Sequence, residues 1–454
     1  MVGILVRGGT VVGPSGVARN DLRLRAGRIA EIGPGLRPDG DRIVDAGGLT
    51  VLPGAIDPHG HQWEPGFTSP PDFTDTTGSA AVGGVTTLLD HPLTTPVVVD
   101  LATYEAKAAL GERTSLIDFG LHVGASPATL DELPGLWAAG ATGVKVFTCP
   151  TGTPLDGFDD PVLLEGLFAR LGAIEALALV HAEDRATLDA NAGWLRAGRQ
   201  TDATGFPEWH DMAAELTAVN RVLALAAQQR VATYIVHASQ PAVVEAVRMA
   251  AAGGMSAWAE TCPHYLHLTD ADLARLGARA MTAPPVRDEP ARAALRRALS
   301  DGSIVTVGSD HCAIGAAGKD VTAMEQIVPG VPGLDLFMPL LLELVVGGDL
   351  TLERLTQATA ASPARIFGLS DRKGRFEVGL DADLVLVDLA ASRVVRAADL
   401  PGSAGWSPYE GMTLRGTVIS TWCRGTEVAR DGRPTGRPGF GRHLTRGGDG
   451  RNRG

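Results

Sequence analysis

The chain has 454 residues, a net charge of −12 and a hydrophobic share of 44%. This size and composition favour one large domain with a smaller one over several independent small domains. Basic residues are scattered and are not interleaved with aromatic residues on one face, which argues against a nucleic-acid partner. No apolar run approaches the roughly 20 residues that cross a bilayer, so no membrane partner is expected.

The cysteines and the N-terminal residues indicate where the protein works. The four cysteines include no close-spaced pair, which disfavours an extracellular disulfide framework and a cysteine-rich zinc site. The N-terminal residues lack a charged leader followed by an apolar segment and a cleavage site. We therefore expect a soluble protein of the cytoplasm.

Both ends of the chain predict short strands joined by glycine-rich turns. Apolar and polar residues alternate there, as in strands that bury one face. Strands are expected over residues 4–12, 21–33, 42–48, 382–389, 414–425 and 426–434. We therefore expect one small β-sandwich domain assembled from residues 1–52 and 375–440. Residues 441–454 are rich in glycine and arginine and are expected to form a flexible tail.

The middle of the chain, residues 53–374, alternates short apolar strands with amphipathic helices. Eight strands are expected, over residues 55–61, 85–91, 116–123, 143–149, 177–184, 233–239, 255–262 and 304–311. Helices are expected between them, for example over residues 208–230 and 241–254. Apolar strands that are each followed by a helix indicate an α/β fold with a covered parallel sheet, and eight such units predict a (β/α)8 TIM barrel. A doubly wound open sheet is the alternative.

Metal-binding side chains end several of these strands. In a barrel of this kind the chemistry gathers at the carboxyl ends of the strands. His59 and His61 are separated by one residue, so both side chains point to the same face of their strand. His181, His237 and Asp310 end three other strands. Imidazole and carboxylate ligands together indicate zinc, manganese, iron or cobalt rather than magnesium or calcium.

Lys145 lies on the fourth expected strand, where an ammonium group would be repelled by metal ions. Desolvation lowers the pKa of a lysine and frees its amine. A free amine can add carbon dioxide and become a carbamate, which carries a negative charge and can bridge two metal ions. A surface lysine with an ion-pair partner is the alternative that the spacing leaves open.

Other residues near the strand ends have simpler interpretations. Four further histidines are not expected to be metal ligands. Each is expected to be a core residue or to support a ligand, and they are His91, His122, His264 and His311. Cys312 follows Asp310 closely, but no activating base accompanies it in the sequence. We expect a buried structural thiol there.

Six segments, in chain order, resemble the cyclic amidohydrolases, which include dihydroorotase, allantoinase, hydantoinase and dihydropyrimidinase. These segments are PGAIDPHGH, GVKVF, VHAED, YIVHAS, ETCPHYL and GSDH. The resemblance also covers GLDADLVLVD near the end of the chain and therefore extends over nearly all of it. It implies a centre of two divalent metal ions, with zinc as the first choice and manganese, cobalt or iron as alternatives.

The resemblance also implies which residues bind these ions. His59 and His61 would bind one ion, and His181 and His237 would bind the other. N6-carboxylated Lys145 would bridge the two ions. Asp310 would ligate the first ion.

The implied reaction is the hydrolysis of a ring amide. Water activated by the two ions would attack the amide carbonyl. Asp310 would take a proton from that water and later return one to the leaving ring nitrogen. Relatives commonly assemble as dimers or tetramers, so a homo-oligomer is expected.

Within this family the sequence most resembles allantoinase. HQWEPG, GGVTTLLDHPLTTP, FTCPTG and WSPYEGMTLRGTV are allantoinase-like segments. Dihydroorotase carries an arginine and an asparagine where this chain has Trp63 and Ala283, and an indole cannot neutralise a substrate carboxylate. Hydantoinases carry a tyrosine at the position of Pro150, yet GSDHCA resembles their version of the last strand end. Trp63, Ala283 and Pro332 are expected to contact the ring.

Two alternatives to an allantoinase stay open at this point. One is a hydantoinase or dihydropyrimidinase that acts on hydantoins or related cyclic imides. The other, more remote, is a scaffold that keeps the barrel without catalysis, as some relatives do after losing their metal ligands. All six ligand positions are occupied by suitable residue types here.

Overall fold

A computed structural model describes residues 3–14, 16–66, 72–155, 157–198 and 200–447. Parallel strands near the centre of the chain form a barrel, as the sequence predicts. Its strands are β6 (Ala55–His61), β7 (Val85–Asp90), β8 (Asp118–Leu121), β9 (Val123–Gly124), β10 (Val144–Phe147), β11 (Leu177–His181), β12 (Ala232–Ile235), β13 (Ala257–Thr261), β14 (Thr306–Val307) and β15 (His311–Cys312). Every one of the predicted barrel strands is therefore confirmed.

The barrel wall consists of two hydrogen-bonded sheets that share two interrupted strands. One sheet has the order β15-β6-β7-β8, and the other has the order β14-β13-β12-β11-β10-β9. His122 alone separates β8 from β9, and residues 308–310 separate β14 from β15. Each pair is thus one strand with a break near its carboxyl end. The break at residues 308–310 contains a predicted metal ligand.

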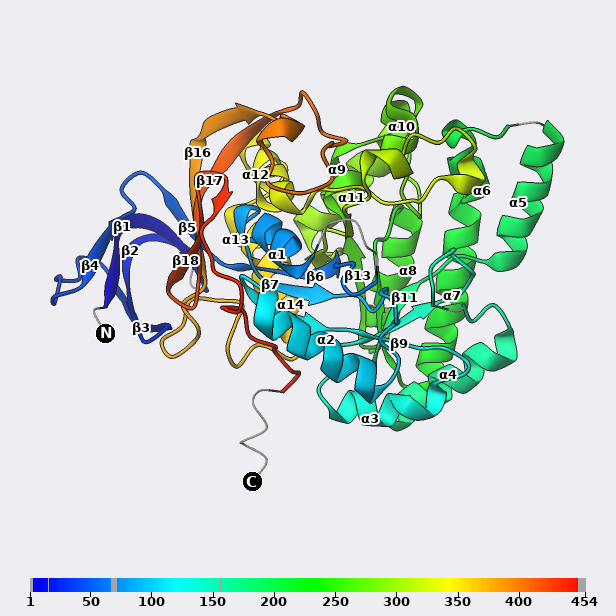
Figure 1. The fold of residues 1–454 in the computed structure, drawn as a ribbon, viewed down its shortest axis with the longest axis horizontal. Coiled ribbons are helices and arrows are strands. Elements are labelled where there is room, and N and C mark those ends of the chain that lie inside the picture. Colours follow the sequence, from blue (N-terminus) through cyan, green and yellow to red (C-terminus); the bar gives the residue numbers. More distant parts are fainter. Residues whose placement is uncertain (1–2, 15, 67–71, 156, 199, 448–454) are drawn as a thin grey trace.

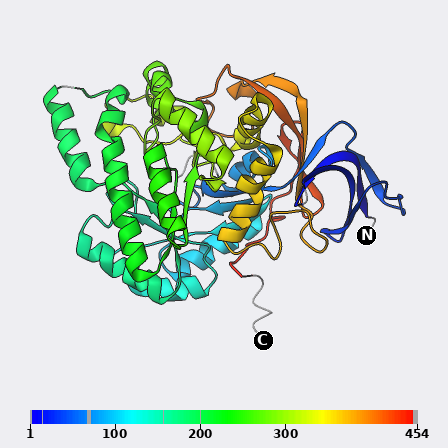
Figure 2. The ribbon, with the colours of Figure 1, turned by 180° about the vertical axis from the view of Figure 1, so that it is seen from behind.

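Helices cover the outside of the barrel (Figures 1 and 2). They are α1 (Phe73–Val82), α2 (Leu101–Thr114), α3 (Leu133–Ala138), α4 (Pro161–Ala173), α5 (Arg185–Gly198), α6 (Phe206–Trp209), α7 (Met212–Gln229), α8 (Pro241–Ala252), α9 (Pro263–His267), α10 (Asp270–Leu276), α11 (Glu289–Asp301), α12 (Phe337–Gly347), α13 (Leu352–Thr356) and α14 (Ser362–Ile366). The long helix α7 begins where Asp211 accepts the N–H of Ala214, and it buries Val219 and Val222 against the barrel. None of the helices in the described ranges is long and apolar enough to cross a membrane.

Strands from both ends of the chain form one separate sheet beside the barrel (Figure 1). They are β1 (Ile4–Gly13), β2 (Gly16–Arg25), β3 (Arg28–Gly33), β4 (Arg42–Asp45), β5 (Thr50–Pro53), β16 (Leu384–Val394), β17 (Thr413–Cys423), β18 (Thr426–Arg430) and β19 (Arg433–Pro434). The order is β19-β18-β17-β16-β5-β1-β2-β3, and β4 pairs with β1. Leu22, Val51, Leu384 and Trp422 belong to its own buried core. The expected β-domain built from both termini is confirmed.

A buried network of charged groups joins the barrel to the β-domain. Nζ of Lys373 donates to Oδ2 of Asp118 and to Oδ2 of Asp383, both over 2.6 Å. Nε of Arg424 donates to Oδ1 of Asp118 over 3.1 Å. Asp118 lies on β8 of the barrel, whereas Asp383 and Arg424 flank strands of the β-domain. The carboxylates fix the relative position of the two parts because each is buried and paired with a cation.

Residues 441–447, which the sequence analysis assigns to a tail, lie against the barrel. The N–H of Leu444 donates to the carbonyl of Phe119 over 2.7 Å, and the N–H of Phe119 donates to the carbonyl of Arg442 over 3.0 Å. Leu444 is buried, and the guanidinium of Arg446 lies 3.7 Å from the ring centroid of Trp137. These contacts outweigh the polar, glycine-rich composition of the segment. Residues 448–454 lie outside the described residues.

Replacing the central cation of this network is expected to destabilise the protein. Lys373→Met leaves the buried carboxylates of Asp118 and Asp383 without their shared partner, at a cost of about 3–5 kcal/mol in the free energy of unfolding. Chemical denaturation measures this cost. Arg375→Met is the matched control, because its ion pair with Glu377 is solvent-exposed and is worth at most about 1 kcal/mol. Equal losses in the two variants would contradict the interpretation.

Candidate metal centre

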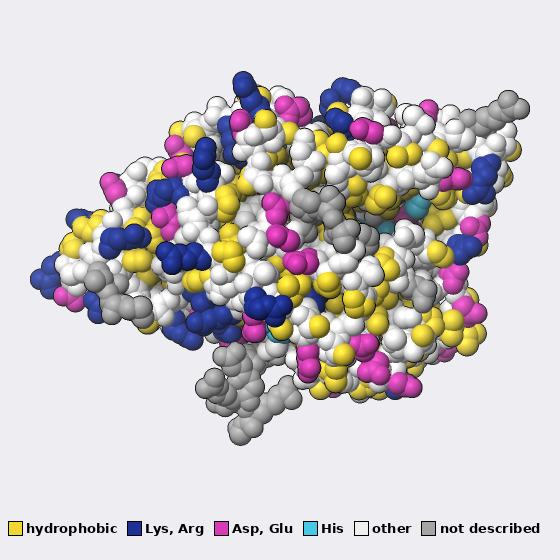
Figure 3. All heavy atoms as spheres, in the orientation of Figure 1, with side chains coloured by type: hydrophobic (Ala, Val, Ile, Leu, Met, Phe, Trp, Pro, Cys, Tyr) yellow, Lys and Arg dark blue, Asp and Glu magenta, His cyan; other side chains and the backbone are white. Residues whose placement is uncertain are grey.

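The carboxyl ends of the barrel strands enclose a cavity of about 120 Å³. It is lined by all of the predicted metal-binding residues, namely His59, His61, Lys145, His181, His237 and Asp310. Histidine side chains are visible at the bottom of a hollow on this face of the molecule (Figure 3). The fold therefore brings the whole predicted set together at one end of the barrel.

His59 and His61 lie on β6 and face Asp310 across the cavity. Oδ1 of Asp310 lies 3.2 Å from Nε2 of His59 and 3.1 Å from Nε2 of His61. Nδ1 of His59 donates to Oε1 of Glu260 over 2.7 Å, which leaves the lone pair on Nε2. Burial lowers the pKa of His59 well below its usual value, so this ring is neutral. Two acceptor atoms, Nε2 of His59 and Oδ1 of Asp310, therefore face each other at close range.

The backbone that carries Asp310 is held by a buried carboxylate. Asp57 accepts the N–H and the hydroxyl of Ser309, over 2.9 and 2.5 Å, and the N–H of His59 over 3.1 Å. Asp310 itself has a φ of +47°, and His237 has a φ of +41°. Residues other than glycine adopt this left-handed conformation uncommonly, and aspartate and histidine do so more often than most. The conformation turns both side chains into the cavity.

His181 and His237 form a second pair of converging imidazoles. Nδ1 of His181 lies 3.0 Å from Nε2 of His237. Nε2 of His181 donates to Oε2 of Glu183 over 2.9 Å, so the lone pair of His181 is on Nδ1. The other oxygen of Glu183 accepts from Nδ1 of His210 over 2.8 Å. Glu183 thus fixes both the orientation and the tautomer of His181.

Two sets of atoms each fit one divalent cation. The first set is Nε2 of His59, Nε2 of His61 and Oδ1 of Asp310, and the second is Nδ1 of His181 and Nε2 of His237. Two nitrogen or oxygen atoms bound to one zinc ion lie about 3.0–3.4 Å apart, given bonds of about 2.0–2.1 Å, and the separations here are 3.0, 3.1 and 3.2 Å. Nε2 of His59 and Nδ1 of His237 have no hydrogen-bond partner within the described ranges. A buried acceptor without a donor costs about 1–3 kcal/mol. A cation bound by His59, His61 and Asp310 would remove that cost for Nε2 of His59.

Lys145 lies on β10 and lines the same cavity as the His59–His61–Asp310 set and the His181–His237 pair. Its side chain is buried, so it is not the surface lysine that the sequence left open. Burial lowers its pKa to about 8, against the opposing effect of nearby acidic groups such as Asp310. About a tenth of the amine is therefore free at pH 7, far more than for an ordinary lysine.

Two of the three residues expected to contact a substrate line this cavity. Trp63 and Ala283 line it, and the indole of Trp63 is stacked on His61 with ring centroids 5.8 Å apart. Pro332 is buried nearby, but the lining part of its segment is residues 328–330. Leu93 and Phe147 make the mouth apolar. No arginine is among the described lining residues.

The sequence analysis did not identify the carboxylates that support the histidine ligands. Glu260 binds His59, and Glu183 binds His181. A signal for Glu260 exists in the sequence, because it is the one charged residue in the apolar strand β13. Glu183 follows its histidine by two residues, which is a weaker signal.

The other histidines and Cys312 largely follow expectation. Nε2 of His122 lies 3.1 Å from the carbonyl of Pro58, and Nδ1 of His311 accepts the N–H groups of Gly333 and Leu334. Burial raises the pKa of the Cys312 thiol well above its usual value, so the thiol is not activated as a nucleophile. His91 is different, since neither ring nitrogen has a partner in the described part of the chain.

Comparisons with known proteins agree with this geometry. An allantoinase from Rubrobacter xylanophilus is 37% identical over 96% of both chains. A dihydroorotase from Halobacterium salinarum is 37% identical over 91% of this chain and 96% of its own. The solved structure of the L-hydantoinase (dihydropyrimidinase) from Arthrobacter aurescens superposes with a TM-score of 0.94, at 30% identity, over 98% of this chain and 100% of the other. The profile of the Amidohydrolase family matches residues 50–428, and the chain belongs to that family.

Proposed function

We propose that the protein is an allantoinase-type hydrolase that opens a cyclic ureide with the help of two divalent metal ions. The observation that carries this proposal is the pair of ligand groups with atoms 3.0–3.2 Å apart. His59, His61 and Asp310 would hold one ion, and His181 and His237 would hold the other, with carboxylated Lys145 between them. Zinc is the first choice, with manganese, cobalt or iron as alternatives. When bound, such ions lower the pKa of a water molecule toward about 7 and polarise a carbonyl group.

Asp310 is the proposed proton carrier. Its carboxylate takes one proton from the attacking water as the oxygen bonds to the ring carbonyl carbon. The carbon–nitrogen bond of the ring then breaks, and the same carboxylate returns the proton to the leaving nitrogen. The hydrogen bonds from Ser309 to Asp57 fix the backbone next to Asp310. The balance is one water molecule added and one amide bond opened.

Allantoin is the proposed substrate because allantoinases are among the most similar relatives, at 36–38% identity over at least 93% of the chain. Trp63 occupies the position at which a dihydroorotase would need a cation, and its indole lines the cavity. A hydantoin is the second candidate. The apolar surface of Trp63, Leu93 and Phe147 favours it, since a hydantoin can carry an apolar substituent.

A cytoplasmic location and a homo-oligomer, either a dimer or a tetramer, complete the proposal. Both follow from the sequence analysis and from the family. Size-exclusion chromatography with light scattering measures the assembly.

A substrate panel tests the proposed reaction. Protein loaded with manganese, zinc or cobalt is expected to open allantoin, and to do so faster than hydantoin, dihydrouracil or dihydroorotate. Removal of the metal by a chelator is expected to abolish turnover. Good turnover of hydantoin or dihydrouracil without turnover of allantoin would assign the second candidate. A purified protein with well under one metal ion per chain and no turnover of any ring would support a scaffold.

Replacing Lys145 tests the bridging carbamate. Lys145→Ala is expected to lower the metal content from about two ions per chain to one or less and to reduce turnover to background, since a shared ligand is lost. Metal analysis and the panel assay measure both effects. Lys319→Ala is the matched control for metal content, because Lys319 is also buried but donates to the carbonyl of Val328 over 2.7 Å and is not a proposed metal ligand. If Lys145→Ala kept its metal and its activity, the carbamate would have no role.

Reconstitution of the metal-free protein is expected to depend on pH. The pKa of Lys145 is lowered from 10.5 to about 8, so the free amine increases about tenfold per pH unit below 8 and levels off above it. At a fixed pressure of carbon dioxide, the rate at which added metal restores activity should follow this curve. The ¹³C signal of a carbamate from labelled carbon dioxide reports the modification itself. A series without carbon dioxide controls for titration of the histidines, and a rate that ignores carbon dioxide would contradict the prediction.

A further inference from the structure

His91 is placed directly beside the two histidines of β6. It follows the last residue of β7, the neighbouring parallel strand. Its N–H donates over 2.9 Å to the carbonyl of Gly60, the residue between His59 and His61. Its own carbonyl accepts from Nζ of Lys107 over 3.2 Å. The backbone of His91 is therefore tied on both sides, and its position relative to the histidine pair is fixed.

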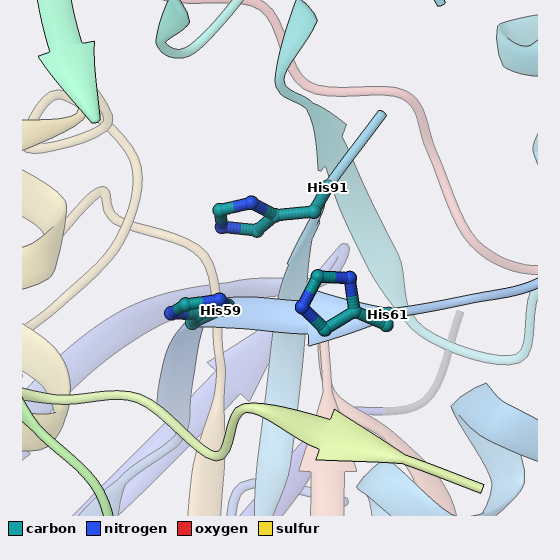
Figure 4. A group of neighbouring side chains, drawn as sticks. All are labelled: His59, His61 and His91. Carbon is teal, nitrogen blue, oxygen red and sulfur yellow. The ribbon is translucent and has the colours of Figure 1, made fainter. Parts of the chain in front are cut away.

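The side chain of His91 lies over the ring of His59 (Figure 4). The two rings are stacked, with centroids 4.0 Å apart and an angle of 19° between their planes. The ring of His61 is 5.1 Å away. One nitrogen from each of the three rings lies within 4.8 Å of the others, and all three side chains are buried. The three imidazoles thus form one compact group.

The nitrogen atoms of His91 lack partners in a buried environment. Neither Nδ1 nor Nε2 has a hydrogen-bond partner among the residues described, and the residue is 1% exposed. Burying an imidazole without partners is unfavourable, whereas an apolar side chain of similar size would leave no polar atom unsatisfied. A neutral imidazole carries a lone pair on one of its two nitrogens.

A core histidine of this barrel has a different environment. His122 lies on the other side of His91, with ring centroids 4.8 Å apart. Its Nε2 lies 3.1 Å from the carbonyl of Pro58, and its Nδ1 lies 2.9 Å from the hydroxyl of Thr142. Protein groups therefore satisfy both nitrogens of His122 and, among the residues described, neither nitrogen of His91.

We propose that His91 is a third imidazole ligand of the metal position formed by His59 and His61. This inference rests on the binuclear function proposed above and adds one residue to its ligand set. Nitrogen atoms on one zinc ion lie about 3.0–3.4 Å apart, whereas one nitrogen from each of these three rings lies within 4.8 Å of the others, so coordination by His91 requires a rotation of its side chain toward the ion. No hydrogen bond to the described residues has to break for that rotation. A third neutral nitrogen strengthens the hold on a transition metal without changing the charge of the site.

The test compares metal retention in variants at position 91. His91→Phe keeps an aromatic ring stacked on His59 and removes both nitrogens. Its first metal ion is expected to be lost at a chelator concentration about ten- to a hundredfold lower than in the unmodified protein. The visible spectrum of the cobalt-substituted protein is expected to change as well, because it reports the number of ligands. His267→Phe is the matched control, since it also removes a buried imidazole, one that lies 2.9 Å from the carbonyl of Leu340.

The outcomes separate this inference from the proposed function. If His91→Phe retains both ions as firmly as the unmodified protein and gives the same cobalt spectrum, the third ligand is disproved and the binuclear centre stands. If the unmodified protein binds no metal, the proposed function itself fails. Circular dichroism checks folding, and His91→Leu replaces the phenylalanine variant if that variant does not fold. Loss of one ion from either folded variant, but not from the control, supports the assignment.

Discussion

The chemistry of this protein depends on one electrostatic constraint, the convergence of lone pairs in a buried space. Nε2 of His59 faces a carboxylate oxygen of Asp310, and Nδ1 of His181 faces Nε2 of His237. Glu260 and Glu183 bind the opposite sides of two of these rings and so prevent them from turning their N–H groups inward. Two facing acceptors such as Nε2 of His59 and Oδ1 of Asp310 are costly for the bare protein, and a bound divalent cation would remove that cost. Much of the barrel end serves to keep these atoms close together.

The barrel itself was predictable because its strands are short, apolar and regularly followed by helices. The convergence of the proposed metal ligands on one cavity was predictable for the same reason, since the carboxyl end of a parallel strand is a fixed location in such a fold. The carboxylates that support the histidines were harder to predict. Residue spacing does not define the direction in which the side chains of Glu183 and Glu260 point. The tail prediction misjudged residues 441–447, where backbone hydrogen bonds to Phe119 matter more than composition.

The importance of His91 also could not be predicted from the sequence. A histidine after an apolar strand has the same pattern whether its nitrogens are satisfied, as in His122, or not. Only the positions of the surrounding groups distinguish the two cases. The same holds for the substrate, because the shape of the cavity is set by Trp63, Leu93 and Phe147, which lie on separate segments. Residue types at single positions exclude some rings but do not select one.

The pairing of residues 442–444 with β8 has a consequence for how the protein is made. Residues 442–444 follow the barrel strands in the sequence, so this edge of β8 stays unpaired during synthesis until the segment has left the ribosome. Arg424, the buried partner of Asp118, also follows all of the barrel strands. The barrel wall is therefore completed only after residue 444 has emerged, and a chain truncated near residue 440 would expose a strand that other chains could pair with.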